Sequence, residues 1–253
     1  MKSRLQIVAA SATAAAAALT VGLSACGGSN SNSADNSDAA NLVKNSATAS
    51  TDLTSTHFVL TADGKIPSLS VDKVEGDLQN KPAVLGSGSV NATVGNAQNG
   101  QWVFIDGHMY SNLLTGKYID YGPGTAIYNV NNLFDANKGI PGVLNNMTNL
   151  HEQGSETIAG QNTEKISGTV PASYASNLSG MTIGQGKDKN APVPITVWIQ
   201  KTGDHELVQV QSAPVDNSTL QLTFSDWGKP VTATKPAVSN PPALPGGTEL
   251  KKK

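Results

Sequence analysis

Residues 219–225 read Thr-Leu-Gln-Leu-Thr-Phe-Ser, and the alternation in this stretch decides the fold class. The apolar side chains Leu220, Leu222 and Phe224 stand at every second position, with polar side chains between them. A period of two is that of a β-strand with one buried face and one exposed face. The stretch therefore predicts a sheet that covers a core on one side only, as antiparallel sheets commonly do.

The same signal recurs along the chain. In residues 90–94 the apolar Val90, Ala92 and Val94 alternate with polar residues in the same way. The dipeptide Asp106-Gly107 separates two apolar runs and is a strong signal for a β-hairpin. Strands are expected over residues 57–61, 69–78, 84–94, 101–105, 108–112, 163–167, 195–200, 207–211 and 219–225.

Helical signals are few. Asp38 can cap a helix over residues 39–53, with Leu42, Val43 and Ala47 on its inner side. Other elements are expected over residues 126–130 (a short segment), 141–147 (a helix) and 172–178 (a helix). Together these patterns predict an α+β fold, in which an antiparallel sheet is covered on one face by a few helices.

The first 25 residues have the three zones of a secretory signal peptide. Lys2 and Arg4 form a charged start, and an apolar run follows over residues 5–23. The tetrapeptide Leu23-Ser24-Ala25-Cys26 resembles the lipobox of bacterial lipoproteins, in which the cysteine thiol is lipidated and the chain is cleaved before it. A transmembrane helix is the alternative, but alanine and hydroxyl residues make the run weakly apolar for a span of about 20 residues. The sequence predicts a lipoprotein anchored through Cys26 on the outer face of the plasma membrane.

The rest of the chain divides by composition. Residues 26–37 are rich in Gly, Ser, Asn and Asp and predict a flexible tether. Residues 38–236 suit one domain. Residues 237–253 hold several prolines and end in three lysines, which predicts a disordered tail.

Charge and cysteine content restrict the function. Signal cleavage removes two cationic residues, which leaves 17 − 2 = 15 against 19 acidic residues. Arg4 is the only arginine, and nucleic-acid sites depend heavily on arginine and positive charge, so a nucleic-acid partner is not expected. Cys26 is the only cysteine, so the domain has no internal disulfide and depends on its core for stability.

Two fragments have the form of catalytic motifs. Ser70 and Lys73 fit the S-x-x-K pattern of penicillin-binding enzymes, and Lys201-Thr202-Gly203 matches their K-T-G. Ser89-Val90-Asn91 supplies a middle S-x-N. The serine of such a site opens a helix, whereas residues 69–78 have the pattern of a strand, where Ser70 and Lys73 point to opposite faces. The expectation is a protein that is not an enzyme.

Metal and cofactor signals are absent from the sequence. The four histidines, at positions 57, 108, 151 and 205, lie far apart without metal-ligand spacing. The sequence contains neither a G-x-S-x-G nucleophile elbow nor a phosphate-binding glycine loop. The tryptophans Trp102, Trp198 and Trp227 are expected to pack in the core or at strand ends. No metal and no cofactor is expected.

A series of short stretches resembles one family. From about residue 41 to residue 236, the chain resembles the mycobacterial LppX/LprA/LprF/LprG lipoproteins in both the order and the spacing of these stretches. The extended, lysine-ended tail departs from the family pattern. The matching stretches are Gly64-Lys65-Ile66-Pro67, Val74-Glu75-Gly76-Asp77-Leu78, Phe104-Ile105-Asp106-Gly107-His108-Met109-Tyr110-Ser111, Ala126-Ile127-Tyr128-Asn129-Val130, Asn137-Lys138-Gly139, Thr196-Val197-Trp198-Ile199 and Ser225-Asp226-Trp227-Gly228-Lys229-Pro230-Val231.

The resemblance implies an antiparallel β half-barrel with helices on its concave face enclosing a hydrophobic cavity. It implies binding of triacylated glycolipids, lipoglycans or triacylglycerol, their transport from the plasma membrane toward the outer envelope, and recognition of the lipidated protein by host Toll-like receptor 2. The pattern alone equally allows an ordinary packed core, and a module that docks a partner protein or wall polymer is the alternative function. The candidate cavity-lining residues are Val90, Ala92, Val94, Val143, Leu144, Leu220, Leu222 and Phe224.

Overall fold

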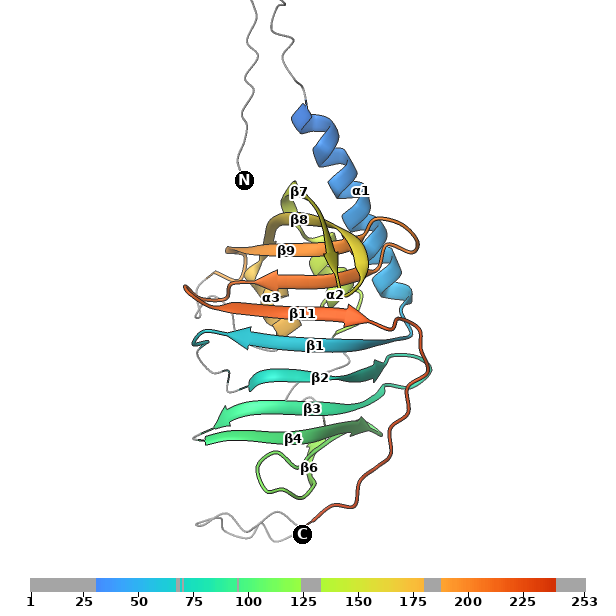
Figure 1. Ribbon diagram of the computed structural model, residues 1–253, viewed down its shortest axis with the longest axis vertical. Coiled ribbons are helices and arrows are strands. Elements are labelled where there is room, and N and C mark those ends of the chain that lie inside the picture. The colour runs from blue at the N-terminus through green and yellow to red at the C-terminus, as the bar shows by residue number, and fades with distance from the viewer. Residues whose placement is uncertain are drawn as a thin grey trace, which may run out of the picture. The chain divides into compact units, whose positions relative to one another are not determined.

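The computed structural model describes residues 31–66, 69, 71–94, 96–123, 133–179 and 188–239 (Figure 1). Strands dominate this part of the chain, and helices are few. The elements are α1 Ser31–Asp52, β1 Ser55–Asp63, β2 Val71–Gln79, β3 Leu85–Val94, β4 Asn96–Ile105, β5 His108–Ser111, β6 Ile119–Pro123, α2 Ile140–Asn145, β7 Thr148–Ile158, β8 Gln161–Pro171, α3 Ala172–Ser179, β9 Pro192–Gln200, β10 Leu207–Ser212 and β11 Thr219–Ser225.

The strands form one open sheet of 11 strands in the order β6-β5-β4-β3-β2-β1-β11-β10-β9-β8-β7. Every neighbouring pair is antiparallel. β1 to β6 form one run of neighbouring strands and β7 to β11 form another, and the pairing of β1 with β11 joins them. The predicted antiparallel sheet is confirmed.

The predicted strands all appear, some with shifted ends, and the hairpin at residues 106–107 is confirmed. Asp106 and Gly107 have φ values of 53° and 77°, the left-handed geometry of a tight hairpin turn. The sequence analysis missed β6 and β7. β7 reads Thr-Asn-Leu-His-Glu-Gln-Gly-Ser-Glu-Thr-Ile and is exposed along most of its length, so it lacks the apolar alternation of a half-buried strand. The segment expected over residues 126–130 lies outside the described residues.

Helix α1 differs from its predicted form at the start. It begins at Ser31, so the expectation that Asp38 caps it is wrong, and residues 31–37, predicted as flexible tether, are helical. Polar residues such as Ser, Asn and Asp have weak helix propensity, which is why the sequence did not indicate these two turns. The predicted inner side is confirmed for Val43 and Ala47, which are at most 3% exposed, while Leu42 is partly buried against the same cluster. Ala39, which was not predicted, is buried on this side as well.

The other helices lie where they were expected, over slightly different ranges. In α2 the side chains of Ile140, Val143 and Leu144 are each 2% exposed. α1 contacts β7 and β9, α3 contacts β8 and β9, and α2 contacts both α1 and α3. The described helices are thus associated with the β7–β9 part of the sheet (Figure 1). None of them is long and apolar enough to cross a membrane.

After β11 the chain continues without regular secondary structure as far as Ser239. The backbone amide of Gly228 donates to the carbonyl of Ser55 at the start of β1 (2.9 Å), and the amide of Ser239 donates to the carbonyl of Tyr118, just before β6 (2.9 Å). Between these points the Lys235 ammonium lies 5.7 Å from the ring centroid of Tyr110 in β5. We call residues 229–239 the C-terminal strap, which runs from the end of β11 past β1 to β5 and β6 (Figure 1).

Candidate functional site: the apolar inner face

Cross-strand partners in an antiparallel sheet point to the same face, so the register defines the two faces. From β11, one row of partners is Phe224, Phe58, Gly76, Gly88 and Trp102. The neighbouring row contains Leu222, Leu60, Val74, Val90 and Gly100. Both rows consist of apolar residues and glycines. We call this side the inner face; on β8, β9 and β10 it continues through Ile166, Val197 and Val210.

Seven of the eight candidate lining residues have described side chains, and all seven are buried. Those that belong to one continuous apolar cluster are Val90, Val143, Leu144, Leu222 and Phe224, at 2–8% exposure. Ala92 (2%) and Leu220 (4%) are buried as well. Val94 lies in β3, but its side chain is outside the described residues. The structure therefore brings five of the candidates together, and their role as a cavity lining stays a prediction.

Trp102 lies over two glycines of the inner face. A Cβ atom built on Gly76 would lie 2.7 Å from Cζ2 of Trp102, and one built on Gly88 would lie 2.6 Å from Cα of Gly76. The indole ring centroid is 5.9 Å from that of Phe58, and Nε1 donates to the carbonyl of Glu75 at 3.2 Å. The absence of side chains at 76 and 88 gives the indole its space. Core packing of Trp102, as predicted, is confirmed by its 6% exposure.

Part of the inner face is not fully covered. Leu60 and its cross-strand partner Val74 are only partly buried, although both pack against the apolar cluster. Val71, near the start of the same strand, is also partly buried. Apolar surface on β1 and β2 is therefore accessible to an apolar ligand without unfolding of the core.

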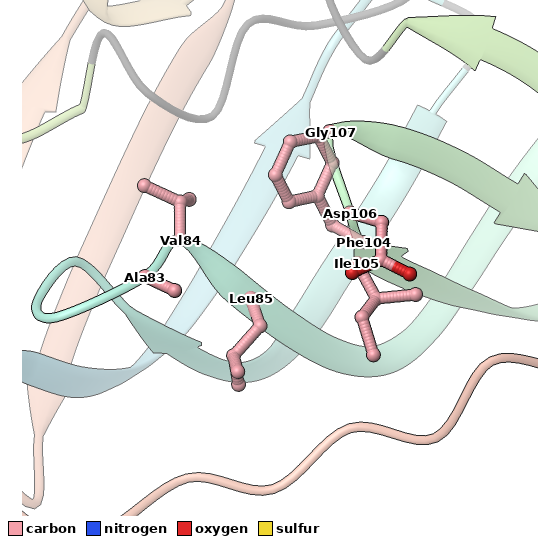
Figure 2. A pocket seen from close by; sticks show the side chains of 7 residues that line it. All are labelled: Ala83, Val84, Leu85, Phe104, Ile105, Asp106 and Gly107. Atoms are coloured by element: carbon pink, nitrogen blue, oxygen red, sulfur yellow. The ribbon is translucent and has the colours of Figure 1, made fainter.

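A pocket of about 280 Å³ opens where the pairing of β3 with β4 ends (Figure 2). Its lining is of mixed character, with apolar side chains beside backbone polar groups and the Asp106 carboxylate, and Phe104, which is 2% exposed, belongs both to this lining and to the inner-face cluster. The lining residues are Ala83, Val84, Leu85, Phe104, Ile105, Asp106 and Gly107. This pocket was missed in the sequence because it is formed by two turns that are about 20 residues apart in the chain.

The opposite face of β1 and β2 is polar. The Lys73 ammonium lies 2.6 Å from the Glu75 carboxylate, and His57 Nδ1 lies 2.8 Å from the Asp77 carboxylate. The hydrogen bond from Lys73, followed by that from Ser89, lowers the pKa of Glu75. Charge is thus carried by the outer face, while the inner face of these strands is apolar.

The lysines of the two catalytic-like fragments both form ion pairs. Lys73 pairs with Glu75, and Lys201 Nζ lies 2.8 Å from a carboxylate oxygen of Glu164 and 2.6 Å from Oγ of Ser155. Residues 201–203 lie in the turn between β9 and β10, as expected, whereas Ser70 lies outside the described residues.

In the described ranges, no group of three or more His, Cys, Asp or Glu side chains converges on one point. His108 instead lies 3.0 Å from Asp120, and His205 Nδ1 lies 3.0 Å from the carbonyl of Gln200. Both histidines flank turns.

An open antiparallel sheet with few helices is also the architecture of known lipoproteins. The model of the LppX_LprAFG lipoprotein family matches residues 38–233, and the chain belongs to this family. It is 42% identical to the putative lipoprotein LprA of Mycobacterium bovis over 80% of this chain and 83% of that protein. It is 36% identical to the lipoarabinomannan carrier protein LprG of Mycobacterium leprae, over 84% and 88% of the two chains.

Solved structures agree with the family assignment. LprF from Mycobacterium bovis superposes with a TM-score of 0.69 at 25% identity, covering 79% of this chain and 98% of that one. LppX from Mycobacterium tuberculosis superposes with a TM-score of 0.58 at 26% identity, covering 78% and 98%. The resemblance in short sequence stretches is therefore confirmed as a family relationship.

Proposed function

We propose that this chain is a membrane-anchored carrier that binds the acyl chains of envelope lipids against its inner face. The observation that carries the proposal is the continuous apolar face across β1 to β4 and β8 to β11, part of which remains accessible at Leu60 and Val74. The family relationship supports it, because a relative at 36% identity is named a lipoarabinomannan carrier.

The energetics suit an acylated ligand. Burial of each CH₂ group of an acyl chain contributes about 0.8 kcal/mol, so a chain of ordinary length gains several kcal/mol from an apolar face. The inner face offers little to a charged headgroup, since the ion pairs of β1 and β2 lie on the other side of the sheet. The headgroup therefore stays outside, and the protein distinguishes its ligands mainly by their chains. Triacylated glycolipids, lipoglycans and triacylglycerol all meet this requirement.

The anchor is lipid on Cys26. Two or three acyl chains on one residue give durable attachment, whereas one chain gives marginal binding. This places the domain at the outer face of the plasma membrane, where it accepts lipids and passes them toward the outer envelope. The acylated N-terminus is also the part that host Toll-like receptor 2 recognises. No bond is made or broken in this function, and the protein acts without catalysis.

Organic extraction of the purified domain separates this function from docking of a partner protein or wall polymer. The protein is produced in a mycobacterial host without residues 1–25, and the extract is analysed by mass spectrometry. A carrier yields acylated lipid at about one molecule per chain. A clean extract from correctly folded protein favours the docking module instead.

A further inference from the structure

The pocket at the end of the β3–β4 ladder is formed by two turns. Residues 83–85 enter β3, and residues 104–107 leave β4 and turn into β5. The last pair in the register of these strands at this end is Gly86 with Phe104. Beyond that pair the two strands no longer bond to each other, and the space between them is the pocket.

The pocket is continuous with the inner face. Figure 2 shows Val84 and the ring of Phe104 on one side of the strands, with Leu85 and Ile105 on the other. Val84 packs against the apolar cluster of the inner face, to which Phe104 itself belongs. Gly86, the partner of Phe104, has no side chain, and a Cβ atom there would lie 3.0 Å from Cδ1 of Leu78. Phe104 therefore belongs to both the pocket lining and the apolar cluster, and its cross-strand partner is a glycine.

The size of the pocket fixes what it can hold. An apolar cavity of about 150 Å³ binds benzene. A pocket of about 280 Å³ is therefore large enough for a segment of one acyl chain. The carboxylate of Asp106 belongs to the lining, so the apolar part is continuous with a polar rim.

We propose that this pocket is the mouth through which acyl chains reach the inner face, one chain at a time, with Phe104 as the side chain that must turn aside. This inference rests on the proposed carrier function and adds the route that the ligand takes. This route assigns a specific role to the side chains of Val84 and Phe104, which line the pocket. A larger side chain in the lining slows lipid uptake, and a smaller one accelerates it. The route does not require any change in the amount of lipid held at equilibrium.

Uptake kinetics test this route with variants at the rim. Ala83 is exposed, so Ala83→Trp is compatible with folding while its indole fills the mouth. Val84→Ala widens the mouth. The control is Thr202→Trp, which adds the same indole to an exposed residue in the turn between β9 and β10. The probe is triacylglycerol with one pyrene-labelled chain, offered to the full-length lipidated protein in phosphatidylcholine vesicles. Unfolding midpoints are recorded for each variant.

The expected result is uptake at least about tenfold slower for Ala83→Trp, faster for Val84→Ala and unchanged for Thr202→Trp. Uptake by Ala83→Trp at the wild-type rate would contradict the proposed entry route and leave the carrier function intact. Equal slowing by Thr202→Trp would also contradict this route, because an added indole would then slow uptake wherever it is placed, by its contact with the vesicle surface. A wild-type protein that takes up no probe would overturn the carrier function itself, and the mouth with it.

Discussion

Trp102→Ala tests the packing of the inner face most sharply. The indole fills the space above Gly76 and Gly88, lies 5.9 Å from the Phe58 ring and donates one hydrogen bond of 3.2 Å to the carbonyl of Glu75. Truncation of a buried Trp to Ala costs about 3–5 kcal/mol, and the high end applies where the surroundings cannot collapse. The backbone of three paired strands lines this site, so collapse is restricted. We expect a loss of about 4 kcal/mol in the free energy of unfolding.

Urea unfolding followed by far-UV circular dichroism measures this loss. Trp102→Phe keeps a ring above the glycines but removes the hydrogen bond, so about half of the lost stability should return. Trp227→Ala is the matched control, because that indole is only partly buried at the end of β11. We expect it to cost less than about 1.5 kcal/mol.

A loss below about 1 kcal/mol for Trp102→Ala would refute the reasoning, because the indole would then contribute no more than a surface side chain. The same variant informs the carrier function. If lipid lies on this face, the vacated space adds room for an acyl chain, and bound lipid should be retained or increased despite the lower stability.

Three other predictions follow from the same account. Cys26→Ser removes the lipidated thiol, so the protein should be found as uncleaved precursor or as soluble protein and should lose Toll-like receptor 2 activity; a variant still cleaved before residue 26 and still lipidated in mass spectra would contradict the anchor. Val90→Trp adds an indole on the inner face, where Val90 is 8% exposed. The variant should hold less lipid in organic extracts, with little change in melting temperature. If the indole instead overpacks a closed core, the free energy of unfolding should fall by about 1–3 kcal/mol. Burial, followed in importance by the charge of Asp204, raises the pKa of Glu206 to about 7. The ordinary pKa of a glutamate is 4.5, so between these two pH values the folded state holds a proton that the unfolded state has released. Unfolding free energy should therefore fall as pH rises between these values, and Glu206→Gln should remove that fall in urea midpoints; an unchanged slope would mean that Glu206 is solvated.

The fold was predictable wherever one face of a strand is apolar. β11 and β3 show the alternation directly, and the turn at Asp106-Gly107 carries its own signal. β7 was not predictable, because it is an edge strand whose side chains are largely exposed and whose sequence is polar apart from Leu150, Gly154 and Ile158. The start of α1 was not predictable for a related reason, since residues 31–37 are Ser, Asn and Asp apart from Ala34, and these polar residues have weak helix propensity.

The candidate site was predictable in part. Alternation identified Val90, Leu222 and Phe224 as residues of one buried face, and the register confirms this. It gave no indication that Gly76 and Gly88 lie side by side beneath Trp102, because that arrangement depends on the register between neighbouring strands, which the alternation within one strand does not fix. For the same reason, no local pattern distinguishes residues around an open space from residues that fill a core.

Native mass spectrometry of the wild-type protein tests the central claim most directly. The protein, purified free of lipid in mild organic solvent and refolded, is incubated with phosphatidylcholine vesicles that contain triacylglycerol and then separated from them. The account predicts a new species heavier by one triacylglycerol per chain, diminished in Val90→Trp and releasing fatty acids on fragmentation. A spectrum in which folded protein keeps its bare mass at saturating triacylglycerol would contradict the claim that the inner face binds acyl chains.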